Sequence, residues 1–522
     1  MRNAPPEKPT RADLSGSTHV PRSRRDFLIA GALAAAAIVP RPAVAQGTPK
    51  SRRISAKPRK LSTPVVAQSF SVIPPPYEWA SVPLRLARRV TNGLTAADVT
   101  AVQSLGYQEY LNLQVHAEEI DDSVVESEVA AMWPLLSQTS AQLFAANSST
   151  VQEQLQEATI YRSAFSTRQL YQRMVEFWSD HFNIYVGKVG YLKAIDDRDV
   201  IRANAFGTFP ELLYASSHSP AMLAYLDQSS SRAGAPNQNY AREVMELHTL
   251  GVNGGYTQTD VAELSRVLTG WTLTGTGTFV FNPVLHDWGQ KTVLGVTIPA
   301  SSPSVGAAGV QEGETIMAML ANHPSTRQFI ATKLLKWLLT PEPSAEQVNA
   351  IADAYAATGG DITLMVRAIL NEGWMATAPA KFKRPFHFLV SSLRTTNPAV
   401  TSVTSLNGQL GVLGQSLFFW ETPDGYPDTV DYWSGNIVPR WQFGNTLANM
   451  KTASTVNLST APYLAGTTDA AISLIEANFF GGELPVVTRI SLLSYLNGGT
   501  FNDTRVRETI GLALGAAEFQ WY

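Results

Sequence analysis

From Trp79 to the end of the chain, apolar residues recur mostly at intervals of three and four positions, with small polar residues where each run begins. This spacing places apolar side chains on one face of an α-helix, and the polar residues suit helix N-caps. The sequence therefore predicts the mainly α class, with a single large helical domain over residues 79–522. A C-terminal helical subdomain starting at about residue 450 is an alternative division of the same region.

Only the stretch from Trp271 to Pro299 has the alternation and the β-branched residues that are typical of strands. The runs Thr278–Phe281 and Thr292–Ile298 carry this pattern, and we expect them to pair with each other. The helical domain is thus predicted to contain a small β-hairpin excursion around residues 271–299. A two-stranded excursion of this size does not change the fold class.

The beginning of the chain differs from the rest in charge. Residues 1–60 hold 13 Lys and Arg but only three acidic residues, and the whole chain contains no cysteine. Arg24-Arg25 precedes an uncharged run from Phe27 to Val39, which is followed by Ala43-Val44-Ala45. These are the charged, apolar and small-residue zones of a secretory signal. Because the paired arginines are followed by Phe and Leu, we predict a twin-arginine signal peptide over residues 1–45, read by the twin-arginine export machinery.

The predicted mature chain begins at Gln46 and would lie in the periplasm or outside the cell. Residues 46–78 are basic and contain several prolines, and they are predicted to form a linker. From Gln46 onward, 33 basic and 40 acidic residues give a net charge of −7, which argues against nucleic acid as a partner. No segment of the mature chain reaches the roughly 20 apolar residues of a membrane span, so we expect no transmembrane span there. The export route permits a bound cofactor without indicating which one.

Polar residues are densest between Pro236 and Gly251. Asn237 or Asn239 can cap a helix in this segment and Gly251 can end it, while a second helix is expected to begin at Thr259-Asp260. Ionisable residues on both helices make this pair of helices the strongest candidate for chemistry. The catalytic candidates are Arg242, Glu243, Glu246 and His248, and the binding candidates nearby are Asn239, Tyr240, Arg266 and Trp271.

The expected helical geometry limits what the catalytic candidates can do together. At about 100° per residue, Glu243 and Glu246 lie about 60° apart, whereas His248 lies about 160° from Glu246. One metal ion cannot take all three side chains from a regular helix, so a metal site would need Asp227, Asp180 or a second histidine. In the alternative, structural interpretation, Arg242 pairs with Glu246, Glu243 holds Arg266 or the Gly254-Gly255 turn, and His248 is a core residue.

A second polar cluster lies at residues 176–183. Arg173, Glu176 and Asp180 share one face of the helix expected there, which Ser166 or Thr167 can open. His181 lies on the opposite face, beside apolar residues, where a histidine is more often part of the core than a ligand. Asp180, His181 and Asp227 complete the binding candidates.

Several of these motifs also occur together in one known family. They are FWSDHF at 177–182, NQNYAREVMELHTLGVNGGYTQTDV at 237–261 and RVLTGW at 266–271, with support from HPSTRQFIATKL at 323–334, GGDI at 359–362 and KRP at 383–385. With these motifs, the chain resembles the bacterial proteins grouped as domain of unknown function 1800. It departs from the family pattern at Gln238, where Glu is usual, and near Tyr426, where Trp is usual. The resemblance implies a large, mainly helical exported protein, often encoded beside a second exported family.

Two functional hypotheses follow. The preferred one is an exported assembly or binding protein that works with another exported protein, with the polar residues bracing the helical core. The alternative is a periplasmic hydrolase that uses the paired carboxylates of Glu243 and Glu246, assisted by Arg242, His248 or His181, with or without a metal ion. The sequence does not decide whether the chain is an enzyme, but clustering of Asp180, His181, Asp227, Glu243 and Glu246 in space would favour the hydrolase.

Overall fold

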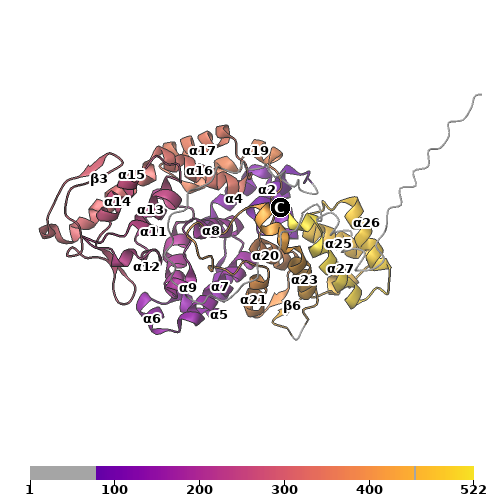
Figure 1. Ribbon diagram of the computed structural model, residues 1–522. Helices are drawn as coiled ribbons and strands as arrows, with labels where there is room; N and C mark the ends of the chain where they lie inside the picture. The colour runs from indigo at the N-terminus through magenta and orange to yellow at the C-terminus, as the bar shows by residue number, and fades with distance from the viewer. Residues whose placement is uncertain (1–77, 452–453) are drawn as a thin grey trace, which may run out of the picture.

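The computed structural model describes residues 78–451 and 454–522, and these residues fold mainly into α-helices (Figure 1). The mainly α prediction is confirmed. The signal peptide predicted over 1–45 and all but the last residue of the linker predicted over 46–78 lie outside the described residues. None of the helices in the described ranges combines the length and apolar character that crossing a membrane requires.

A first hydrophobic core joins residues between Leu84 and Ala378. Its helices are α2 (Val82–Val90), α3 (Ala96–Leu105), α4 (Tyr107–Val115), α6 (Ser140–Ala145), α7 (Ser148–Phe165), α8 (Gln169–His181), α9 (Val186–Val189), α10 (Leu192–Asp196), α11 (Phe209–Ser217), α12 (Pro220–Tyr225), α13 (Gln238–Glu243), α14 (Gln258–Val267), α15 (Gln311–Asn322), α16 (Pro324–Leu338), α17 (Ala345–Thr358), α18 (Ile362–Ile369) and α19 (Glu372–Thr377). Two π-helical segments, η3 (Asp197–Arg202) and η5 (Val244–Thr249), continue α10 and α13.

A second hydrophobic core is built mostly from the C-terminal helices. These are α20 (Pro385–Thr396), α21 (Thr404–Val412), α22 (Val430–Trp433), α23 (Ile437–Ala448), α24 (Ala461–Leu464), α25 (Thr468–Phe480), α26 (Val486–Asn497) and α27 (Asp503–Gly515). The same core also takes in α5 (Ser123–Met132) and part of α7, so the two cores share elements and do not divide cleanly along the chain. Short 3₁₀ turns complete the helical elements: η1 (Ala117–Glu119), η2 (Pro134–Ser137), η4 (Gln228–Ser230), η6 (Pro303–Val310), η7 (Ser434–Asn436) and η8 (Glu518–Gln520).

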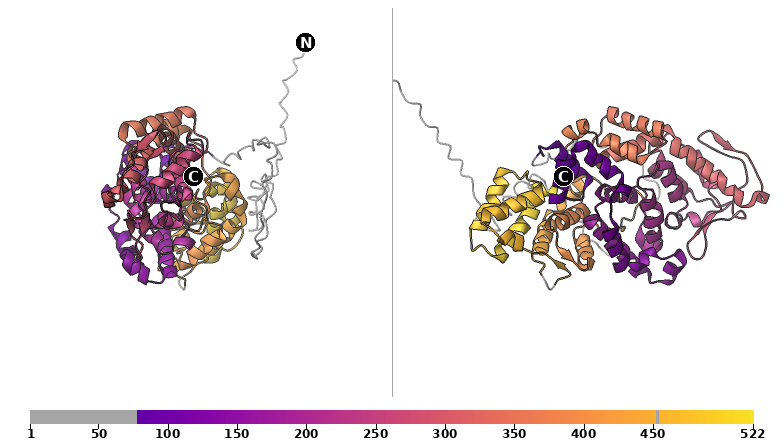
Figure 2. Two further views of the ribbon diagram at one scale, coloured as in Figure 1. Left: turned by 60° about the vertical axis from the view of Figure 1, so that its left-hand side comes forward. Right: turned by 180° about the vertical axis from the view of Figure 1, so that it is seen from behind.

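Helix α8 lies near the centre of the molecule, between the two cores (Figure 1). Ten of its 13 residues are buried, including residues on its polar face. It contacts α2, α4, α7 and η3, while the strand segment at residues 271–298 and α25–α27 lie at opposite ends of the molecule (Figure 2). A central helix with charged residues on a buried face must find partners for them within the protein.

The strands form small antiparallel pairs, as predicted for residues 271–299, but the predicted pairing is wrong. β1 (Trp271–Leu273) pairs with β2 (Phe279–Phe281), and β3 (Lys291–Val293) pairs with β4 (Val296–Ile298). The run Thr292–Ile298 folds back on itself because Leu294 and Gly295 both have positive φ and form a two-residue turn. A third pair, β5 (Ala399–Val400) with β6 (Val456–Asn457), was not predicted.

Of the three helix starts predicted from the sequence, one agrees with the structure. Asn237 caps α13, as expected, by accepting a hydrogen bond from the backbone N–H of Asn239. The predicted start of α14 at Thr259-Asp260 is wrong, because Thr257 is the N-cap and Asp260 completes its capping box. Ser166 and Thr167 do not cap α8 either: both bind the carboxylate of Asp122 instead.

Candidate functional site

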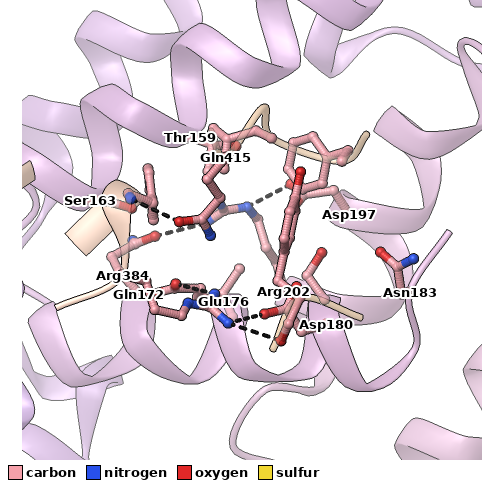
Figure 3. A pocket seen from close by; sticks show the side chains of 16 residues that line it. Thr159, Ser163, Gln172, Glu176, Asp180, Asn183, Asp197, Arg202, Arg384 and Gln415 are labelled. Atoms are coloured by element: carbon pink, nitrogen blue, oxygen red, sulfur yellow. Dashed lines mark hydrogen bonds and ion pairs between the residues drawn. The ribbon is translucent and has the colours of Figure 1, made fainter. Parts of the chain in front are cut away.

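The polar face of α8 is occupied by one guanidinium from the start of α20. Arg384 Nη2 lies 2.6 Å from Glu176 Oε1, and Arg384 Nη1 lies 2.6 Å from Asp180 Oδ2 (Figure 3). The expected shared face of Arg173, Glu176 and Asp180 is thus present, and Arg173 Nη2 donates to the hydroxyl of Tyr522 at 3.0 Å. Burial raises the pKa of Asp180, although the neighbouring Arg384 opposes the shift. The charged face of α8 therefore serves to join it to α20.

A small polar pocket lies beside this ion network (Figure 3). In it, Arg202 of η3 binds Asp197 at 2.7 Å and Gln172 at 3.1 Å. Its volume is about 30 Å³, which admits water molecules and is too small for an organic substrate. Its lining is Thr159, Ser163, Gln172, Val175, Glu176, Ser179, Asp180, Asn183, Asp197, Arg202, Arg384, Phe386, Gln415, Leu417, Phe418 and Tyr426. We interpret this pocket as a hydrated part of the core.

His181 and His248 lie together behind α8 as buried residues. His181 Nε2 is 3.2 Å from the backbone oxygen of His248, and the two rings are 6.4 Å apart in a layer that includes Phe182 and Phe329. Burial lowers the pKa of His248 to about 3, with a further contribution from the positive charge of Lys333, and lowers that of His181 well below its usual value. Both histidines are therefore neutral core residues at physiological pH.

The helix that carries the catalytic candidates is not regular, so the expected geometry is wrong there. From Val244 to Thr249 the backbone is π-helical, and the backbone N–H of Leu250 donates to the carbonyl of Met245, five residues earlier. The hydroxyl of Thr249 makes a matching bond to the carbonyl of Val244 at 2.6 Å. Single π-helical turns inside α-helices are rare and frequently occur at functional sites.

Glu243 and Glu246 lie on the accessible side of this segment. The carboxylate of Glu246 accepts a hydrogen bond from the hydroxyl of Tyr256 at 3.1 Å. Glu243 is half-buried, and no hydrogen bond or ion pair joins its carboxyl group to another described residue. Burial raises the pKa of Glu243, and the negative charges of Glu246 and Asp424 raise it further against the effect of Arg242.

The structural interpretation is therefore wrong for Arg242 and Glu243, whereas His248 is a core residue as it predicts. Arg242 binds Gln258 at 2.7 Å and does not pair with Glu246. Arg266, the expected partner of Glu243, instead binds Glu263 and Asp287, each at 2.8 Å. Glu243 has no bracing contact to account for its position.

A loop from the second core completes the site. Asp424 accepts hydrogen bonds from Trp420 Nε1 at 3.0 Å and from the Thr422 hydroxyl at 2.5 Å. Burial lowers the pKa of Lys333 to about 8, and the negative charge of Asp424 opposes this shift. Burial raises the pKa of the Tyr225 hydroxyl. The negative charges of Glu243, Asp424 and Glu421 raise it further. The hydroxyl of Tyr225 donates to the carbonyl of Glu421 at 2.7 Å, and Nδ2 of Asn237 donates to the carbonyl of Leu226 at 2.7 Å, so this loop and the start of α13 are both held at the end of α12.

The remaining binding candidates have other environments. Asp227 is exposed and forms an ion pair with Lys188 at 2.8 Å, and Lys188 also donates to the backbone of Tyr225. Asn239 is exposed, whereas Tyr240 is buried and donates to the carbonyl of Ser217. Trp271 is buried against His218 and Phe279. The five side chains Asp180, His181, Asp227, Glu243 and Glu246 therefore do not form one cluster: Asp180 is paired with Arg384, Asp227 is paired with Lys188, and His181 is in the core.

Four residues of this site were missed from the sequence: Tyr225, Lys333, Trp420 and Asp424. Lys333 lies within the motif at 323–334, and Asp424 directly precedes the Gly-Tyr-Pro step at 425–427. These motifs are the sequence signals that indicate the two residues. Among the described residues, no group of three or more side chains is arranged to hold a metal ion.

Comparison with known proteins gives one match. A family model described as "Protein of unknown function (DUF1800)" matches residues 85–521, which is most of the chain. No curated protein and no solved structure matches.

Proposed function

The chain belongs to the DUF1800 family, and we propose that it is a hydrolase whose acid–base pair is Glu243 and Glu246. The observation that carries this proposal is the state of Glu243: a half-buried carboxyl without a bracing partner, with its pKa raised by burial and by two neighbouring carboxylates. A raised pKa is in the direction that a general acid needs, because the carboxyl group then keeps its proton more firmly until it is transferred.

Glu246 is suited to act as the base. Its carboxylate is oriented by the hydroxyl of Tyr256, in the way that catalytic bases are commonly held by a third group. In the proposed reaction, Glu246 takes a proton from a water molecule, the water oxygen forms the new bond to substrate, and Glu243 gives its proton to the leaving atom. Asp424 supports the step by disfavouring loss of the Glu243 proton before substrate binds.

The site suits a substrate that is larger than a metabolite. Glu246 and Lys333 are partly exposed and Asp424 is exposed, so the carboxylates line an accessible surface. The enclosed polar pocket beside α8 holds only water-sized volumes. An extended polymer can reach such a surface without a deep cavity.

We propose that the reaction takes place in the periplasm or outside the cell, after export by the twin-arginine route. The support is the Arg24-Arg25 pair with its following apolar run. A fusion of residues 1–50 to a reporter protein tests the route: export is expected to stop when Arg24 and Arg25 are both replaced by Lys. Continued export of that variant would overturn this part of the proposal.

The test of the hydrolase is an activity screen of the full exported protein. Purified protein is incubated with glycans, peptides and esters, and products are identified by mass spectrometry. Wild-type protein is expected to release products from one class, and Glu243→Gln is expected to lose at least a hundredfold in rate. Equal rates for the wild type and Glu243→Gln would contradict the proposal.

An assembly or binding protein that works with a second exported protein is the other candidate. It is favoured by exposed apolar side chains at the start of α26, where Val486, Val487 and Ile490 are 71%, 77% and 52% exposed. Co-purification from the native host separates the two candidates. A stoichiometric partner that is lost on Val487→Asp and kept on Glu243→Gln would support assembly.

A further inference from the structure

Aromatic side chains gather on the loop that carries Asp424 and on α22, which follows it. The ring of Trp420 lies 4.9 Å from that of Tyr426 and 6.0 Å from that of Tyr432. Tyr432 is 51% exposed and Phe419 is 39% exposed, while Trp420 is partly exposed. Among the described residues, this short stretch of chain thus leaves several aromatic side chains partly open to solvent.

The loop is held in place from the first core. Asn183 Nδ2, just beyond α8, donates to the carbonyls of Trp420 and Thr422 at 3.0 and 2.7 Å. The hydroxyl of Tyr225 donates to the carbonyl of Glu421 at 2.7 Å. Because both anchors belong to packed elements, the aromatic surface is fixed relative to the site before any ligand binds. A preformed surface binds with a smaller entropy cost than a mobile one.

The aromatic loop and α13, which carries Glu243, are joined through the end of α12. The hydroxyl of Tyr225 donates to the carbonyl of Glu421 at 2.7 Å, and Nδ2 of Asn237, the N-cap of α13, donates to the carbonyl of Leu226 at 2.7 Å. The carboxylate of Asp424 accepts from the indole of Trp420. Glu421 is exposed on the same loop. Asp227 is also exposed, and its ion-pair partner Lys188 donates to the backbone of Tyr225. Flat aromatic faces therefore stand next to several carboxylate acceptors.

We propose that the substrate is a glycan chain, and that Trp420 and Tyr432 form a platform that holds its sugar rings next to Glu243 and Glu246. Tyr and Trp combine a flat apolar face with a polar edge, which suits the apolar C–H face of a pyranose ring. Carboxylates accept hydrogen bonds from sugar hydroxyls. This inference rests on the proposed hydrolase function and names its substrate class.

The bond that breaks is then a glycosidic bond. Glu243 protonates the glycosidic oxygen as the bond between that oxygen and the anomeric carbon breaks. The oxygen of a water molecule forms a bond to the anomeric carbon, and Glu246 takes the proton of that water. Two carboxyl groups with separate acid and base roles are what glycoside hydrolysis ordinarily requires.

Binding of two fluorescently labelled probes, cellohexaose and a hexamer of N-acetylglucosamine, tests the platform in the full exported protein. We expect wild type to bind at least one of them, and Trp420→Ala and Tyr432→Ala each to weaken that binding at least tenfold. Phe144→Ala is the control, because Phe144 is an aromatic residue 56% exposed elsewhere on the surface, and it should bind as wild type does. Tyr432→Ala also guards against misfolding of Trp420→Ala, since Tyr432 is 51% exposed and Trp420 is only partly exposed.

The two proposals can fail separately. If both proposals are right, Glu243→Gln no longer cleaves the hexamer that wild type binds but still binds it. If wild type binds neither hexamer, or if Trp420→Ala and Tyr432→Ala bind as wild type does, the glycan inference is wrong. A Glu243-dependent activity on peptides or esters would then leave the hydrolase standing. Platform-dependent binding without any Glu243-dependent cleavage would support the glycan site and overturn the hydrolase.

Discussion

Arg384 lies 2.6 Å from Asp180, a residue 204 positions earlier in the chain, and the pair is largely shielded from solvent. Arg384 is the N-cap residue of α20, in the second core, whereas Asp180 belongs to the central helix α8. Gly425, just after Asp424, packs directly on the backbone of Asp180. One ion pair thus connects the central helix, the second core and the loop that borders the candidate site.

Replacement of Arg384 by Met is expected to destabilise the protein strongly. It leaves Asp180 without its ion-pair partner and Glu176 with only the longer contact to Arg173 at 3.5 Å, and removal of one partner of a buried pair costs about 3 to 5 kcal/mol. Urea unfolding followed by circular dichroism measures the loss. The control is Asp469→Asn, which removes an exposed pair with Arg489 and should cost less than about 1 kcal/mol. Equal losses in the two variants would show that Arg384 does not hold the cores together.

Glu243→Gln is expected to abolish activity without lowering stability. Because the raised pKa means that the folded state disfavours the charged carboxylate, the neutral amide should leave the melting temperature unchanged or raise it slightly. Thermal unfolding at pH 7 beside an activity assay measures both effects.

Glu263→Gln is the matched control on the neighbouring helix. Glu263 binds Arg266 and the backbone N–H of Thr292, so its replacement should lower stability by about 1 kcal/mol and leave activity intact. Lower stability in Glu243→Gln, together with lost activity in Glu263→Gln, would show instead that Glu243 has the structural role.

Stability is expected to fall on mild acidification because of the buried histidines. The pKa of His248 is about 3 in the folded state, against a usual value of 6.5, so the unfolded chain binds a proton that the folded chain does not. The stability from neutral His248 is complete above pH 6.5 and is lost as the pH falls toward 3, on the order of 4 kcal/mol in all.

Urea unfolding between pH 7 and pH 4 measures this effect. The slope of the unfolding free energy against pH gives the number of protons taken up on unfolding. In His248→Asn this number should fall by about one, whereas in His116→Asn, at a partly exposed position, it should change little. An unchanged slope in His248→Asn would mean that His248 already takes up its proton in the folded protein.

Gly425→Ala is expected to cost at least about 2 kcal/mol. Gly425 has a φ of +75°, and a Cβ there would lie 2.3 Å from the backbone oxygen of Asp180. The backbone at Asp180 cannot move away easily, because the Asp180 side chain is held by Arg384. Gly435→Ala is the control, since a Cβ at that position meets nothing within 4 Å and its φ is not positive. Thermal unfolding compares them, and a loss at Gly435 equal to that at Gly425 would contradict the argument.

Much of the fold could be predicted because its signals are local. Asn237 caps the helix at Gln238–Glu243 as the sequence indicates, since a cap depends on residues two or three positions away. The hairpin pairing was missed because alternation identifies strands without stating which strand is the partner. The π-helical turn at Val244–Thr249 was missed because a period of 3.6 was assumed throughout.

The candidate site divides in the same way. The sequence by itself determined that α8 carries Glu176 and Asp180 on a charged face, because spacing along a regular helix fixes it. Only the tertiary structure decided that Arg384 neutralises that charged face, that Glu243 has no bracing partner, and that Tyr225 anchors the loop of Trp420 and Asp424. Contacts between residues some 180 to 200 positions apart depend on how the whole chain packs, and no local periodicity records them.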